Sequence, residues 1–366
     1  MKREESEETL VMNATKNGLT MEQLNRYENM LETVGNTPLV RLNYLSEYTS
    51  AKVYAKLESF NPGLASKDRI VKYMVEKAES ESKIKPGGTF IEATSGNTGY
   101  ALASICAMKG YNCILTMKDK ISKSKVDLIK AFGAQVYICP SNVKPNDPKS
   151  YFSVAQRLNE EIDNSYYLNQ NHDTANMDAH FLSTGPEIWE QTEGNITHFI
   201  ACASTGGTVS GCGRFLKTKN PDINVIGVDA VGSYLKPYHE TGKIDETVQG
   251  STELEGVGKK IIPSNVDFDT IDRFITVKDK ESALSIYELA RKGGLLMGYS
   301  SGAAIEGVKA IANELTEDDI VVLLLADHGS KYLTKIYDPE WMKKKGFWDE
   351  SLENVQNNNV PSSMNS

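Results

Sequence analysis

The sequence contains no long apolar segment and little cysteine. The longest strongly apolar run, residues 320–326, is far shorter than the roughly 20 residues that cross a bilayer, so we expect no membrane-spanning helix. The charged N-terminus carries no apolar signal core. The five cysteines form no C-x-x-C pair, and the five histidines are scattered. We therefore expect reduced thiols, a cytoplasmic location and no metal site.

An excess of positive charge is also absent. Lys and Arg number 40 against 49 Asp and Glu, which gives a net charge of −9. This balance argues against non-specific binding to nucleic acid or to an anionic membrane surface. The length of 366 residues predicts about two domains, since a domain averages about 150 residues.

Strand-like and helix-like segments alternate along the chain. Strands are predicted at 53–57, 89–93, 112–117, 135–139, 198–203, 225–229 and 320–326. Helices are predicted at 68–77, 100–109, 123–132, after the turn at 204–208 to about 217, and at 281–292. This order predicts an α/β fold with parallel sheets covered on both faces.

Two such series predict two α/β domains with a cleft between them. We place the N-terminal domain at 28–173, with 39–60 crossing to the other domain, and the C-terminal domain at 174–350. Residues 1–27 are polar and charged, and 351–366 are rich in Asn and Ser, so we expect a mobile segment and a disordered tail there.

Lys67 lies in the first of four polar turns that lie between predicted strands and helices, where ligands of parallel sheets bind. It stands next to a predicted helix start, where a positive charge gains nothing from the helix dipole. An amine held in such surroundings has a lowered pKa and is suited to imine formation. The alternative is a solvated loop lysine, which is the commoner case for a lone lysine.

The second turn is Thr94-Ser95-Gly96-Asn97-Thr98-Gly99. Two glycines and four polar side chains at a helix start indicate a carboxylate site, although Ser, Thr and Asn also cap helices. The third turn, Ser204-Thr205-Gly206-Gly207-Thr208, is typical of a phosphate cradle, or else of a tight strand–helix turn. The fourth, 298–304, contains Ser300 and opens another helix.

Together, these turns resemble those of the fold-type II pyridoxal-phosphate enzymes, in the cysteine synthase and cystathionine β-synthase family. The resemblance covers about residues 28–348. Its motifs are 34–42 (VGNTPLVRL), 67–69 (KDR), 94–99 (TSGNTG), 184–189 (TGPEIW), 205–208 (TGGT), 255–258 (EGVG) and 300–302 (SSG). The stretch 327–347 is more similar to that of cystathionine β-synthases than to bacterial cysteine synthases.

The resemblance implies a pyridoxal 5′-phosphate cofactor bound as an internal aldimine by Lys67, which is also the catalytic base. It implies that Asn97 and Ser300 contact the cofactor ring. The phosphate would be held by Ser204, Thr205, Gly206, Gly207 and Thr208. The substrate would be held by Thr94, Ser95, Gly96, Thr98, Gln170, Glu255 and Gly256.

The implied activity is β-replacement on serine or an O-activated serine through an aminoacrylate, with homocysteine as the leading nucleophile. Cysteine synthase activity on O-acetylserine and sulfide is the nearest alternative, and lanthionine or diaminopropionate formation stays open. The resemblance also implies a homodimer. A non-catalytic cofactor-binding regulatory partner is an alternative of another class, whereas a nicotinamide dehydrogenase would need a dinucleotide fingerprint that we do not find.

The chain departs from the family pattern at four positions. Ala65 replaces a serine two residues before the lysine, and Ser204 replaces a glycine. Asn171 replaces an aromatic residue after Gln170, and Lys259 replaces a tyrosine after the E-G-x-G motif. The N-terminal residues lack Cys and His, so we expect no haem, and the end of the chain predicts no paired regulatory module. The leaving group and nucleophile are thereby left open.

Overall fold

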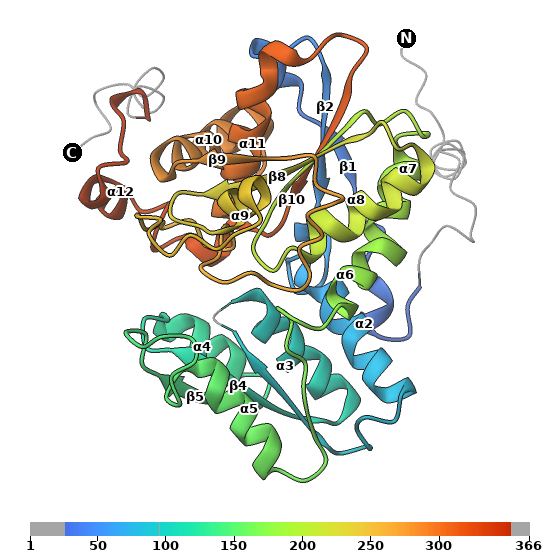
Figure 1. Ribbon diagram of the computed structural model, residues 1–366, viewed down its shortest axis with the longest axis vertical. Coiled ribbons are helices and arrows are strands. Elements are labelled where there is room, and N and C mark those ends of the chain that lie inside the picture. Colours follow the sequence, from blue (N-terminus) through green and yellow to red (C-terminus); the bar gives the residue numbers. More distant parts are fainter. Residues whose placement is uncertain (1–25, 95, 353–366) are drawn as a thin grey trace, which may run out of the picture.

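Two separate sheets organise the chain in the computed structural model, which describes residues 26–94 and 96–352. The larger sheet has the order β1-β2-β10-β7-β8-β9 and the smaller β5-β4-β3-β6. Every neighbouring pair is parallel except β1 with β2. Each sheet lies in its own lobe (Figure 1). The predicted α/β fold with parallel sheets is confirmed.

The strands of the larger sheet are β1 (Leu39–Arg41), β2 (Lys52–Leu57), β7 (His198–Cys202), β8 (Asn224–Ala230), β9 (Arg273–Val277) and β10 (Ile320–Leu325). Those of the smaller sheet are β3 (Thr89–Ala93), β4 (Asn112–Lys118), β5 (Gln135–Cys139) and β6 (Ser165–Tyr167). Residues 39–57 thus add two strands to the sheet built by the second half of the chain. We propose the domain boundary near residue 173, because β6 and β7 lie in different sheets.

The α-helices are α2 (Lys67–Ser80), α3 (Asn97–Lys109), α4 (Lys123–Lys130), α5 (Tyr151–Glu161), α6 (Ala175–Ala179), α7 (Gly185–Gln191), α8 (Gly207–Lys219), α9 (Leu235–Thr241), α10 (Asp279–Gly293), α11 (Tyr299–Ile311) and α12 (Pro339–Lys345). Short 3₁₀ turns are η2 (Met30–Thr33), η3 (Asn43–Glu47), η4 (Glu58–Phe60), η6 (Ala312–Glu314), η7 (Gly329–Tyr332) and η8 (Glu350–Leu352), and η5 (His180–Thr184) is a π-helical turn.

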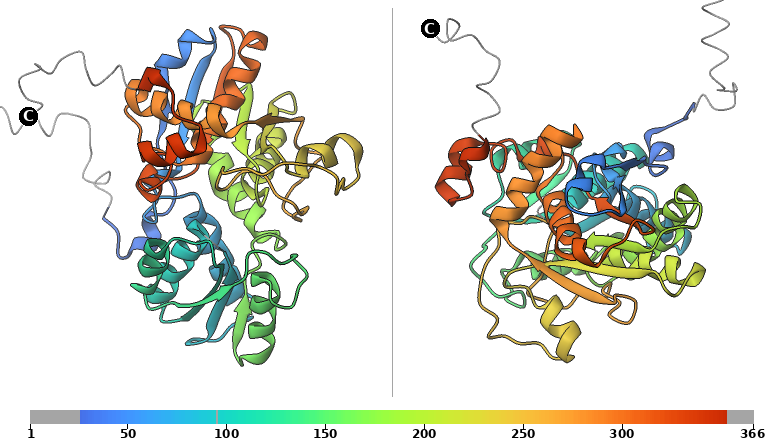
Figure 2. Two further views of the ribbon diagram at one scale, coloured as in Figure 1. Left: turned by 90° about the vertical axis from the view of Figure 1, so that its left-hand side faces the viewer. Right: turned by 90° about the horizontal axis from the view of Figure 1, so that it is seen from above.

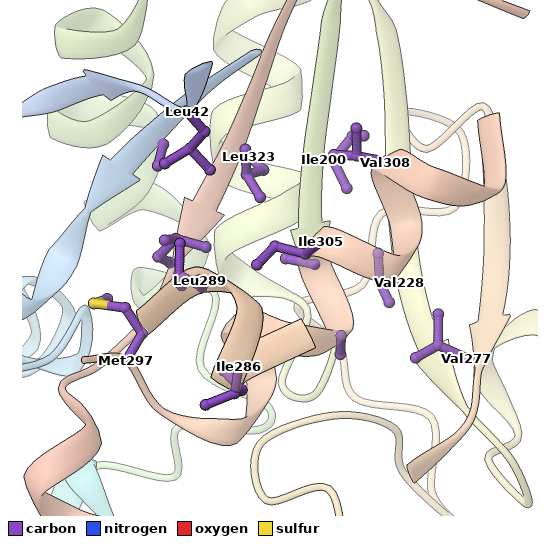
Figure 3. Packing of buried hydrophobic residues seen from close by; sticks show 14 of the residues in the cluster. Leu42, Ile200, Val228, Val277, Ile286, Leu289, Met297, Ile305, Val308 and Leu323 are labelled. Atoms are coloured by element: carbon purple, nitrogen blue, oxygen red, sulfur yellow. The ribbon is translucent and has the colours of Figure 1, made fainter. Parts of the chain in front are cut away.

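The larger sheet is covered on both faces, and β10 shows why. Its side chains alternate between faces, as in any strand. Val321, Leu323 and Leu325 join the cluster formed with α10 and α11, while Val322 and Leu324 join the one formed with α7 and α8. Figure 3 shows the first cluster, with Leu323 facing Leu289 and Ile305. A continuous apolar run is therefore required here, because neither face meets water.

The smaller sheet is covered in the same way. Ile70 and Met74 of α2 and Leu102 of α3 pack with Phe90 on one face, while Ala155 of α5 packs on the other face. Helices α2 and α6 lie where the two lobes meet (Figure 1), and a turned view shows the same two-lobed shape (Figure 2).

The carboxyl end of β10 is tied to the turn that precedes α2. The Ser66 amide donates to the carbonyl of Ala326 over 2.8 Å, and the His328 amide donates to Leu64 over 3.1 Å. Lys67 is thereby fixed beside the end of the large sheet, although it belongs to a helix that packs on the small one. No helix in the described part of the chain is long and apolar enough to cross a membrane. All five cysteines are free.

Candidate functional site between the sheets

Lys67 is the first residue of α2 and faces a cavity of about 480 Å³. Its amine forms no hydrogen bond or ion pair within residues 26–94 and 96–352. Burial lowers the pKa of the Lys67 amine, against the opposing charges of Asp327 and Glu58. A fraction of neutral amine, which is the nucleophilic and basic form, is therefore favoured here.

Most of the predicted site residues line this cavity together with Lys67. They come from separate stretches of the chain: Thr94, Gly96, Asn97, Thr98, Gln170, Ser204, Thr205, Glu255, Gly256 and Ser300. Gly206 and Thr208 line a small adjoining pocket that also contains Lys67. Gly207 lies behind these residues as the first residue of α8, and Ser95 lies outside the described residues.

The turn at the start of α3 is built around Thr98 and Gln170. The Thr98 hydroxyl donates to Gln170 Oε1 over 2.7 Å, and both residues are buried. The helix begins at Asn97, three residues earlier than expected, with Gly96 as its N-cap. Gly96 has no side chain that could accept hydrogen bonds from the N–H groups of the first helical turn. These N–H groups therefore stay available on the cavity side.

Gln170 is itself held by a buried acid, Glu92 on β3. Its side-chain nitrogen donates to Glu92 Oε1 over 3.1 Å. Burial raises the pKa of Glu92 to about 8, so this carboxyl is largely protonated at neutral pH. The backbone carbonyl of Gln170 accepts from the side-chain amides of Asn176 and Asn265. These contacts fix both the backbone and the side chain of Gln170 at the cavity wall.

The turn 204–208 joins β7 to α8 and requires its glycines. Gly206 has φ of +90°, and a Cβ there would lie 2.4 Å from Val266. A Cβ on Gly207 would lie 2.1 Å from Asn176 Oδ1. Because neighbouring residues pack directly against these two glycines, the turn is tight. The first N–H groups of α8 and the hydroxyls of Thr205 and Thr208 can then form an anion-binding cradle.

His180 supports this cradle from the π-helical turn η5. Its Nε2 lies 3.1 Å from the Thr208 hydroxyl, and its Nδ1 lies 2.9 Å from the Thr184 hydroxyl. Complete burial lowers the pKa of His180 to about 3, so the ring is neutral and carries one donor and one acceptor. Sequence reasoning missed His180, because its partner Thr208 is distant in the chain.

Asn97 is held at both ends of its amide. Its nitrogen donates to Asp327 Oδ2 over 2.7 Å, and its oxygen accepts from Lys331 Nζ over 2.7 Å. Tyr332 donates to the same Asp327 oxygen over 2.7 Å. The other oxygen of the buried Asp327 has no hydrogen-bond partner within the described residues. Asn97 also lines the cavity that contains Lys67.

Ser300 lies at the start of α11, at the floor of the cavity. Its carbonyl accepts from the Cys202 thiol over 3.1 Å, and Cys202 lines the adjoining pocket. Burial raises the pKa of this thiol, which keeps it protonated and uncharged. A neutral hydroxyl and a neutral thiol, rather than a carboxylate, therefore lie at this end of the cavity.

Glu255 connects the loop 254–258 to the opposite side of the cavity. Its Oε2 lies 2.6 Å from Lys125 at α4, and its Oε1 pairs with Lys335. These two cations lower the pKa of Glu255 and keep it ionised. The loop is thus fastened across the cavity mouth.

Beneath Lys67, a buried ionic network fixes the start of α2. Arg69 pairs with Glu58 over 2.7 Å and with Glu187 of α7 over 2.6 Å. Lys56 on β2 also pairs with Glu187 over 2.6 Å, and the Thr37 hydroxyl donates to Glu58. The charges hold the pKa of Glu187 down at about 2. The network joins three predicted motifs, 34–42, 67–69 and 184–189.

Residues 30–327 match the family described as "Pyridoxal-phosphate dependent enzyme". The chain belongs to this family. It is 41% identical to the cystathionine β-synthase of Apis mellifera over 90% of this chain, and 41% identical to that of Rattus norvegicus over 88%. It spans only 65% and 57% of those two proteins. It is 38% identical to a cysteine synthase 1 of Emericella nidulans, covering 87% of this chain and 86% of that one.

Solved structures agree with the family assignment. An O-ureido-L-serine synthase superposes with a TM-score of 0.78 at 29% identity, covering 86% of this chain and 96% of that one. A hydrogen sulfide-producing enzyme from Fusobacterium nucleatum superposes with a TM-score of 0.77 at 32% identity, covering 84% and 100%. The predicted family and its pyridoxal phosphate cofactor are confirmed.

The residues present fit this cofactor. The glycine cradle at 204–208 offers N–H and hydroxyl groups to a phosphate, and Lys67 offers an unpaired amine to an aldehyde. The amide of Asn97 lies at the wall of the same cavity. The cavity volume lies in the range of cofactor sites.

The cavity residues that were not assigned a role from the sequence include Asp327, Tyr332, Lys118 and Tyr151. Asp327 directly follows the predicted apolar strand 320–326, so its position at a strand end was an available indication. Lys118 ends β4 in the same way.

Proposed function

We propose that this chain catalyses pyridoxal-phosphate-dependent β-replacement on serine or an O-activated serine. One observation carries the proposal: the unpaired amine of Lys67 shares one cavity with a phosphate cradle and with a carboxylate site. When bound, the cofactor supplies an electron sink for the bond broken at the substrate Cα.

The chain's own residues would divide the remaining work. The substrate carboxylate would be held by the Thr94 hydroxyl, by the Gln170 amide nitrogen and by the N–H groups of the α3 N-terminus, where Thr98 lies. Lys67 would remove the Cα proton and later return it, which its lowered pKa favours at neutral pH. Glu255 and Gly256 would hold the loop across the mouth and limit entry of water.

For the nucleophile, homocysteine is our first candidate and sulfide the second. The identity to cystathionine β-synthases, 41%, supports the first. The identity of 38% to a cysteine synthase of nearly matching length supports the second. We further propose a cytoplasmic homodimer; sedimentation analysis tests the oligomeric state.

Product identification tests the proposal. Purified protein with pyridoxal phosphate is incubated with serine, O-acetylserine and a panel of thiols and amines, and products are identified by mass spectrometry. We expect a thioether amino acid, cystathionine if homocysteine is the nucleophile. Cofactor binding without any β-replacement product would instead support a non-catalytic regulatory protein.

A further inference from the structure

The cavity wall carries a cluster of lysines that the proposed roles do not use. Six lysines line the cavity: Lys67, Lys118, Lys120, Lys125, Lys259 and Lys335. The acids among the lining residues are Glu255 and Asp327. The cavity therefore carries a surplus of positive charge, in a protein whose net charge is −9.

Ion pairing accounts for only part of this surplus. Lys125 and Lys335 both pair with Glu255, and Lys67 is reserved for the cofactor. Lys118, Lys120 and Lys259 have no carboxylate partner within the described residues. Lys118 instead lies 5.0 Å above the ring of Tyr151, which also lines the cavity. These three cations define what we call the lysine trio.

The trio lines the same cavity as Lys67. Burial, together with the charges of Lys118 and Lys67, lowers the pKa of Lys259 to about 8. Burial and the charge of Lys120 likewise lower the pKa of Lys118. Lys118 is thus near enough to repel the other two amines, and Lys259 is still largely protonated at pH 7. Holding like charges together without a counter-charge is unfavourable, and an anionic ligand would relieve it.

A second polar group points to the same ligand position. Asn171 is 2% exposed, lines the cavity, and its side-chain oxygen has no partner within the described residues. A buried amide oxygen without a partner is costly, and the oxygen and nitrogen of the amide exchange places by a half-turn, which would turn the N–H groups toward a ligand. Asn171 and Lys259 are also two of the positions at which the chain departs from the family pattern.

We propose that the lysine trio and Asn171 bind a phosphate leaving group, so that O-phosphoserine is the preferred first substrate. This inference rests on the proposed β-replacement. Lysine is a common phosphate ligand that acts as a point charge, and several lysines together suit the higher charge of a phosphate. The substrate's own carboxylate already has the neutral donors of Thr94, Thr98 and Gln170.

The reaction balances without a further reactant. The Cβ–O bond breaks and its electron pair leaves with the phosphate, while a thiol sulfur forms the new Cβ–S bond. The thiol proton ends on the phosphate, and the Cα proton is removed and returned by Lys67. The trio would stabilise the charge that develops on the leaving oxygen, which neither serine nor O-acetylserine carries to the same extent.

Kinetics with three first substrates test the inference. With the holoenzyme and a fixed thiol, we expect kcat/KM for O-phosphoserine at least tenfold above that for serine and O-acetylserine. Lys118→Met and Lys259→Met should each lower the O-phosphoserine value at least tenfold and change the O-acetylserine value less than threefold. Lys130→Met, on the exposed end of α4, is the matched control and should change neither.

Binding provides a readout apart from turnover. Calorimetry on borohydride-reduced holoenzyme should show O-phosphoserine binding that weakens at least tenfold in Lys118→Met and Lys259→Met. Turnover of serine or O-acetylserine without preference for O-phosphoserine would overturn the inference and leave the proposed function standing. The inference would also be overturned if Lys118→Met and Lys259→Met changed only the kinetic constants for homocysteine. If no substrate reacts, the proposed function fails, and the calorimetry alone decides whether the trio binds phosphate.

Discussion

Asn97 and Asp327 are 230 positions apart in the chain, yet the Asn97 amide nitrogen donates to Asp327 Oδ2 over 2.7 Å. The contact joins the start of α3 in the small lobe to the end of β10 in the large one. It also aims the amide of Asn97 across the cavity beside Lys67. The cofactor site is therefore assembled only when both lobes are in place.

Removing Asp327 should weaken cofactor binding. Asp327→Ala leaves Asn97 without the acceptor that orients it, and we expect the Kd for pyridoxal phosphate to rise about tenfold, the equivalent of about 1.4 kcal/mol. Tyr332→Phe removes the other donor to the same oxygen and leaves Asn97 paired, so it should raise the Kd less than threefold. Absorbance titration of the cofactor-free protein measures both. Equal losses in the two variants would contradict the orienting role.

Glu92 should act in its neutral form. Because its pKa is raised to about 8, Glu92→Gln replaces a neutral acid by a neutral amide of similar size. We expect kcat/KM at pH 7 to stay within threefold in this variant. Glu92→Ala removes the partner of Gln170 and should raise KM for the amino-acid substrate about tenfold with a smaller change in kcat. A Gln variant as impaired as the Ala variant would show that the ionised form is needed.

The ionic network beneath Lys67 should dominate local stability. Arg69→Met leaves Glu58 and Glu187 without their shared cation, which should cost about 3–5 kcal/mol of unfolding free energy. The exposed pair Arg157–Glu161 offers a matched control, and Arg157→Met should change stability by less than about 1 kcal/mol. Urea unfolding followed by circular dichroism compares the two. Similar losses of unfolding free energy in the two variants would contradict the larger contribution expected of the buried network.

Stability should also fall with acid because of His180. Its pKa is about 3 when folded and about 6.5 when unfolded, so the unfolded chain binds the extra proton between these values. The contribution is complete above about pH 6.5 and is lost as the pH falls toward 3. When the pH falls from 7 to 5, the unmodified protein should lose about 2 kcal/mol more unfolding free energy than the His180→Gln variant.

Unfolding of the cofactor-free protein at the two pH values measures this effect. If the unfolding free energy changes with pH in the same way in His180→Gln as in the unmodified protein, the ring of His180 is protonated in the folded protein.

Many of the regular elements could be predicted because their side-chain pattern is visible within a short stretch of sequence. The apolar run of β10 and the helical spacing of Ile70, Val71, Met74 and Val75 in α2 follow from which face is buried. Strands β1, β6 and β9 and helices α5, α6, α7, α9 and α12 were not predicted. The pairing of the three-residue strands β1 and β6 depends on neighbours far along the chain.

The site could be predicted only as far as its residues occur in short motifs. The turns 94–99 and 204–208 carry their glycines and hydroxyls together, so they stand out in the sequence. His180 and Glu92 contribute through contacts to residues that are distant in the chain. Asp327 could be noticed as a residue at a strand end, but its contact with Asn97 could not be predicted from the sequence. The lysine trio likewise becomes visible only when β4 and the loop after 254–258 meet at one cavity.

Borohydride reduction of the holoenzyme, followed by peptide mass spectrometry, tests the central claim most directly. We predict a reduced pyridoxal phosphate adduct on Lys67, and loss of both the adduct and the visible absorption band in Lys67→Ala, with Lys259→Ala as the control that retains both. An adduct on another lysine, or a coloured and active Lys67→Ala protein, would contradict the account.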